Sequence, residues 1–122
     1  MGYPMPAGIY NMKVEQGVTF VQNMTWKIDS NAVNLSGYTA RMNVRTSRSG
    51  RVPANILILA LTSSDGITLG GAAGTIRIDL SATQTSNISA GTYAYDLELE
   101  SAGEEVTRLL SGTFTVSPEV TY

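Results

Sequence analysis

Three carboxylates spaced by two residues, Asp96, Glu98 and Glu100, are the residues of this sequence whose type and spacing could perform chemistry. Acid–base hydrolysis of the glycosidase type needs two carboxylates that face each other across a cleft, one of them desolvated so that its pKa rises. Residues two apart lie on the same face of one strand. We interpret them as a solvated strand face, with a calcium site built from carboxylate oxygens as the alternative.

The sequence contains neither His nor Cys. Their absence removes Ser-His-Asp and Cys-His nucleophilic sites and the usual zinc ligand sets. The glycine-rich stretch Gly70–Gly74 lacks the Lys-Ser/Thr pair of a phosphate-binding loop, so we interpret it as a turn. We predict that the protein is not an enzyme and has no catalytic residue, no cofactor and no bound metal.

The composition is typical of one β domain. The chain has 122 residues, of which 43% are apolar and 15% charged, with a net charge of −2. This charge gives no attraction to nucleic acid or anionic lipid. No apolar run approaches the ~20 residues that span a bilayer, and the first residues lack the basic start and apolar core of a signal peptide. We therefore expect cytosolic synthesis and no nucleic-acid or membrane partner.

Apolar residues alternate with polar ones over most of the chain, which indicates strands with one buried face. The turn pairs Ser36-Gly37, Ser49-Gly50, Asp65-Gly66, Ala90-Gly91 and Ala102-Gly103 separate them at the spacing of a β-sandwich. The alternating sets are Val18, Phe20, Met24, Trp26 and Ile28; Tyr38 to Val44; Ile76, Ile78 and Leu80; Tyr93 to Leu99; and Phe114 and Val116. Among these, we expect Trp26, Met42, Ile78, Tyr95, Leu97 and Phe114 in the core.

Two segments depart from this alternation. Ile56–Leu61 is uninterrupted aliphatic sequence, which fits a central strand covered on both faces or an edge strand hidden in an interface; we expect the first. Ser81 and Gln84 have the spacing of a capping box and predict one short helical turn.

Contacts with other proteins are expected at three places. The prolines of an N-terminal arm, residues 1–8, favour extended backbone, so Tyr3 and Met5 could bind a neighbour. Arg48 and Arg51 lie in a Ser/Gly loop from which they could bind carboxylates. After Pro118 ends the last strand, Val120 and Tyr122 could form a docking hook.

The basic stretch begins earlier in the chain, at Arg41 and Arg45, which share the outward face of one predicted strand. If that strand pairs with the one that carries Asp96 and Glu98, we expect cross-strand ion pairs.

Several segments together resemble small virion proteins of tailed bacteriophages. They run from about residue 15 to the C-terminus and include Glu15–Phe20, Trp26, Leu35–Arg45, Gly66–Gly70, Gly74–Ile76, Ala90–Leu99, Val106–Leu110 and Val116–Val120. The set is similar to the immunoglobulin-like N-terminal domain of phage baseplate upper proteins and to stand-alone sandwich proteins of phage structural gene clusters. Baseplate upper proteins continue into a long stalk, whereas this sequence ends at Tyr122.

The resemblance implies an all-β, immunoglobulin-like antiparallel sandwich of seven to nine strands over residues 9–122. It also implies a virion protein, made in the bacterial cytoplasm. The leading hypothesis is a capsid decoration (cement) protein, a homo-oligomer with a trimer favoured, that binds the major capsid protein. The alternatives are a small tail or baseplate adaptor and a carbohydrate-binding module on the virion surface.

Overall fold

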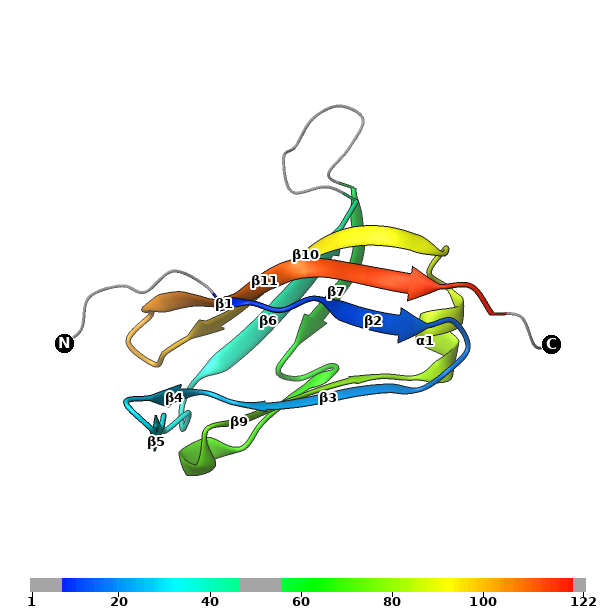
Figure 1. Ribbon diagram of the computed structural model, residues 1–122. Helices are drawn as coiled ribbons and strands as arrows, with labels where there is room; N and C mark the ends of the chain where they lie inside the picture. The colour runs from blue at the N-terminus through cyan, green and yellow to red at the C-terminus, as the bar shows by residue number, and fades with distance from the viewer. Residues whose placement is uncertain (1–7, 47–55, 120–122) are drawn as a thin grey trace.

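The computed structural model describes residues 8–46 and 56–119, which fold into two stacked β-sheets (Figure 1). The larger sheet has the strand order β1-β11-β10-β6-β7, with β2 beside β11 as well. Its strands are β1 (Gly8–Ile9), β2 (Met12–Glu15), β6 (Thr39–Arg45), β7 (Leu57–Thr62), β10 (Gly91–Glu100) and β11 (Val106–Ser117). Both β1 and β2 run parallel to β11, and the other pairings are antiparallel.

The smaller sheet has the order β3-β9-β8, and its strands are β3 (Phe20–Thr25), β8 (Ile67–Leu69) and β9 (Thr75–Leu80). A separate hairpin pairs β4 (Lys27–Ile28) with β5 (Asn31–Ala32). The glycine-rich stretch is the predicted turn, and it contains a short 3-10 helix, Gly71–Ala73. The predicted helical turn is α1 (Ala82–Ser86), and its capping box is complete: Ser81 accepts from the Gln84 amide, and Gln84 accepts from the Ser81 amide.

This topology is that of an immunoglobulin-like sandwich. In that fold, strands B, E and D form one sheet and strands G, F and C form the other, with a C′ strand added in variable-type domains. Here β3-β9-β8 and β11-β10-β6-β7 occupy those positions in the same chain order. At the start of β10, the hydroxyl of Tyr93 donates to the carbonyl of Ser89 at 2.6 Å. This bond reproduces the tyrosine corner of immunoglobulin domains, so the fold predicted from the sequence is confirmed.

One continuous core lies between the sheets, and it is built from the inward residues of both. Of the six residues expected there, Met42, Ile78, Tyr95, Leu97 and Phe114 are at most 3% exposed. Trp26 is only half-buried. It follows the end of β3 and packs edge-to-face on Tyr38, with ring centroids 6.2 Å apart.

The prediction that Val18 and Ile28 face inward is wrong. Val18 lies in the turn before β3 and is 49% exposed. Ile28 is 52% exposed in the β4–β5 hairpin, which reverses direction through Asp29 and Ser30, both with positive φ. The prediction extended the alternation of β3 beyond both ends of that strand, where the backbone no longer follows the sheet. It therefore assigned both side chains the wrong facing.

We expected the aliphatic run Ile56–Leu61 to form a central strand, and this prediction is wrong. The run forms most of β7, and β7 is an edge strand that pairs only with β6 among the described residues. Leu61 is buried, but Ile56 and Leu57 are 58% and 46% exposed. Aliphatic composition alone does not distinguish a strand covered on both faces from an edge strand with an exposed side.

Candidate protein-contact surfaces

The six residues that the sequence singled out for protein contact lie outside the described residues. They are Tyr3 and Met5 in the N-terminal arm, Arg48 and Arg51 in the loop between β6 and β7, and Val120 and Tyr122 in the tail. Gly8, the last residue of the predicted arm, belongs to β1. The predicted strand end before Pro118 is confirmed, because β11 ends at Ser117.

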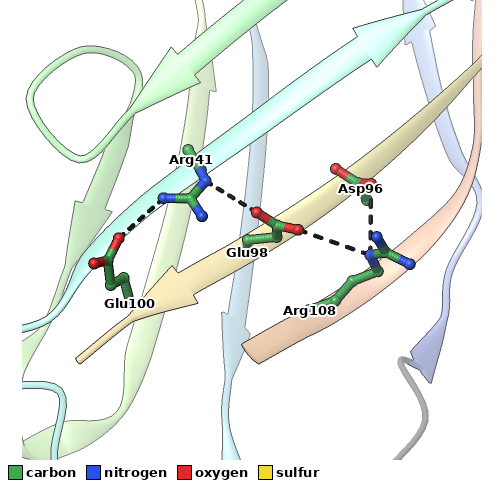
Figure 2. Close-up of polar contacts among 5 residues, drawn as sticks. All are labelled: Arg41, Asp96, Glu98, Glu100 and Arg108. Carbon is green, nitrogen blue, oxygen red and sulfur yellow. Dashed lines mark hydrogen bonds and ion pairs between the residues drawn. The ribbon is translucent and has the colours of Figure 1, made fainter. Parts of the chain in front are cut away.

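The three carboxylates of β10 form a ladder with two arginines on the outer face of the larger sheet (Figure 2). Arg41 on β6 lies directly opposite Glu98. Its Nε is 2.9 Å from one Glu98 oxygen, and its Nη1 is 3.1 Å from a Glu100 oxygen. The Nε of Arg108 lies 3.6 Å from Asp96 and 3.9 Å from the other Glu98 oxygen. The strand that carries Arg41 thus pairs with β10, and the cross-strand ion pair expected on that condition forms at Arg41.

A β-bulge brings Arg108 to this face. In β11, Leu110 lies opposite the inward residue Leu97, so strict alternation would also turn Arg108 inward. The register instead shifts between Leu97 and Glu98, which places Arg108 opposite Glu98 with Leu109 as the extra residue. One additional residue in a strand reverses the facing of the residues beyond it. Here the bulge turns Arg108 away from the core and lets it form ion pairs with Asp96 and Glu98.

The carboxylates of the ladder are paired with the two arginines. The hydrogen bonds that Arg41 donates to Glu100, and then to Glu98, raise the pKa of Arg41 above its usual range. Within residues 8–46 and 56–119, no group of three His, Cys, Asp or Glu residues is placed to hold a metal ion. Asp96, Glu98 and Glu100 instead take part in cross-strand ion pairs with Arg41 and Arg108.

A groove of about 420 Å³ opens at the side of the sandwich, where β1 and β11 of one sheet face the end of β3 in the other. Its apolar lining comes from both sheets: Ile9, Tyr10, Met24, Trp26, Leu109 and Leu110. Lys27 is the one charged residue that lines it. Ile9, at 81% exposure, is the most exposed large apolar residue described.

Tyr10 fixes one wall of this groove through contacts with both sheets. Its carbonyl accepts from the buried hydroxyl of Tyr95 at 2.5 Å, and its own hydroxyl donates to Gln22 of β3 at 3.1 Å. The backbone of Tyr10 also lies against Gly112, where any side chain would collide with the Tyr10 carbonyl. The missing side chain at Gly112 thus allows the N-terminal segment to approach β11 closely.

Sequence reasoning did not identify the groove. The available signals were the apolar pair Ile9-Tyr10 and the adjacent leucines at 109 and 110, which break the alternation of β11. Neither signal says which other strand would lie opposite. The groove exists because β1, β11 and β3, far apart in sequence, meet at one side of the sandwich.

Two further observations concern membrane binding and glycan binding. None of the helices in residues 8–46 and 56–119 is long and apolar enough to cross a membrane. Sugars stack on exposed aromatic side chains; here the exposed Tyr10 and Trp26, which is half-buried against Tyr38, both line the groove.

Comparison with known proteins leaves the family open. No family model and no curated protein matches the sequence. Among solved structures, the chain is similar to an extracellular domain of the voltage-gated sodium channel beta4 subunit, whose parallel homodimers are described as explaining its role in cell–cell adhesion. The identity is 10% and the TM-score 0.41, over 98% of this chain and 100% of that chain. At that similarity, nothing about the function of this chain follows.

Proposed function

We propose that this chain is a non-catalytic structural protein of a tailed-bacteriophage particle, in which it binds the capsid as a decoration protein. Two observations support the proposal. The sequence resembles small phage virion proteins from about residue 15 onward. The sandwich also presents an apolar groove that a protein segment could fill, while the carboxylates of β10 are matched with arginines.

The groove is the observation that carries the proposal. Apolar surface removed from water stabilises a complex by about 25 cal/mol per Å². Ile9 and Tyr10 expose such surface beside the half-buried Met24, Trp26 and Leu109. Protein interfaces are enriched in aromatic and Met side chains, and Tyr10, Trp26 and Met24 line this groove.

The predicted N-terminal contacts fit the same surface. The chain enters β1 at Gly8, directly before Ile9 on the groove. In the proposal, Tyr3 and Met5 bind the major capsid protein next to the segment that fills the groove. Arg48, Arg51, Val120 and Tyr122 remain proposed as secondary contacts.

The test is co-sedimentation of the purified chain with capsids that lack it. We expect Ile9→Asp to weaken binding at least about tenfold, because a charge that must be desolvated at the centre of an apolar contact opposes association. Val18→Asp is the matched control, since Val18 is also exposed but lies outside the groove. Circular dichroism checks that both variants fold.

Equal binding by Ile9→Asp and the parent chain would contradict a role for the groove. Immunogold labelling of intact virions tests the location: label on the head supports the decoration role. Label confined to the tail would overturn that role and favour the small tail or baseplate adaptor.

A further inference from the structure

The outer edge of β7 is uncharged and aliphatic, unlike the outer face of the sheet to which it belongs. Leu57–Thr62 contains neither a charged residue nor a proline, and Ile56 and Leu57 are largely exposed. Natural sheets usually protect an edge with lysines, prolines or charged side chains, because unpaired backbone groups there can pair with another strand.

The backbone hydrogen bonds show which residues of β7 face that edge. The Ser63 amide donates to the Ala40 carbonyl, so the backbone groups of Ser63 point toward β6. Those of Thr62 point away, because they exchange hydrogen bonds with Asp65 at 3.0 and 2.9 Å. Facing alternates along an antiparallel strand, so the amide and carbonyl of Ala60 also point away from β6. Within the described residues, no strand pairs with this side of β7.

The open stretch is short. It ends at Thr62, whose groups the Asp65 turn occupies, and the pairing with β6 shifts register between Val44 and Arg45 near the other end. Ala60 lies between these two limits, so pairing at this edge would be centred on it.

We propose that β7 pairs antiparallel with β7 of a second copy of this chain, about a two-fold axis close to Ala60. The pairing would join two six-stranded sheets edge to edge. The Ala60 amide would donate to the partner strand, and the Ala60 carbonyl would accept from it. This inference rests on the proposed assembly function and adds the partner and the geometry.

Complementarity favours a second copy as the occupant. Rotation about a two-fold axis turns an antiparallel edge into its own complement, since each strand then gives and receives the same bonds. The strand carries no charge that would repel its copy. With strands spaced by about 4.8 Å, the two β6 strands would lie about 14 Å apart, so Arg45 would be at least that far from its counterpart, beyond the screening length of about 8 Å at physiological ionic strength.

A contact this short should be weak between free molecules. On a particle surface, neighbouring copies are held close together, and the high effective concentration raises the fraction of weak contacts that form. The predicted dimer therefore forms in solution only at high protein concentration.

Sedimentation velocity from about 1 µM to about 1 mM, a range that covers weak association, tests the proposal. We expect the parent chain to pass from monomer to dimer. Ala60→Pro should raise the dimer Kd at least about tenfold, because it removes the outward amide at a position where an edge strand tolerates proline. Ala60→Lys should do the same, because it places like charges directly opposite each other across the two-fold axis at an exposed position, and it decides the matter if Ala60→Pro fails to fold. Thr68→Lys on β8, an edge of the other sheet, is the matched control and should dimerise like the parent.

A monomer throughout the range, a trimer, or unchanged dimerisation of Ala60→Lys would overturn the proposal. The two proposals fail separately. A chain that stays monomeric yet binds capsids through Ile9 refutes only the β7 pairing, whereas a β7 dimer that ignores capsids refutes only the decoration role.

Discussion

Strands β10 and β3 both alternate between inward and outward side chains, but they differ in burial. The inward residues of β10, Tyr95, Leu97 and Leu99, are 3%, 0% and 0% exposed. The corresponding residues of β3, Phe20, Gln22 and Met24, are only half-buried. A period of two thus identifies the facing of a side chain and not its depth.

The neighbours of each strand explain the difference. β10 lies between β6 and β11, which flank it along its length. Among residues 8–46 and 56–119, β3 pairs only with β9, and on its other side Gln22 and Met24 line the groove. The strand that is incompletely covered is therefore the one that offers a contact surface.

The largest expected effect on stability comes from core substitutions, which test the difference in burial between β10 and β3. Leu97→Ala should lower the free energy of unfolding by about 2–5 kcal/mol, because it leaves a cavity in a fully buried site. Met24→Ala should cost less than half as much, since water already reaches part of that side chain. Urea denaturation measures both. Equal losses would show that β3 is as deeply covered as β10.

Alkaline pH tests the burial of β10 at Tyr95, whose hydroxyl donates a hydrogen bond to the Tyr10 carbonyl on the groove wall. Burial, followed by the charge of Tyr10, raises the pKa of Tyr95 to about 12, against about 10 in an unfolded chain. Because ionisation is opposed only in the folded state, stability is complete below pH 10 and falls as the pH rises toward 12. The expected loss is about 2–3 kcal/mol.

Urea titrations at pH 9 and pH 11.5 measure this loss. Tyr95→Phe should be less stable at pH 9 by about 1 kcal/mol, for the missing hydrogen bond, and should lack most of the further decline. A decline of undiminished size in Tyr95→Phe would assign the alkaline instability to other groups.

The smallest effect concerns the outer face of β10. A double-mutant cycle with Arg41→Gln and Glu98→Gln should give a coupling of about 0.2–1 kcal/mol, because both side chains remain partly exposed. High salt should reduce it further. A coupling above about 2 kcal/mol would mean that the ladder stabilises the sheet as much as a core contact does.

Local patterns were predictable where their physical cause is local. The Ser81–Gln84 capping box needs only four consecutive residues, and it forms as predicted. The pairing of Arg41 with Glu98 was predictable only on the condition that their strands are neighbours. The outward position of Arg108 was not, because it depends on a bulge that fits β11 to β10.

Side-chain type and period were enough to predict the longer alternating strands, the turns that separate them within the described residues, the lack of His and Cys chemistry, and the facing of most core residues. That β7 is an edge, that β3 is half covered and that a groove lies between β3 and β1 became apparent from the tertiary structure alone. These features depend on which strands become neighbours. The same aliphatic and alternating segments suit a covered strand and an edge strand alike, so burial depth and contact surface follow from the fold as a whole.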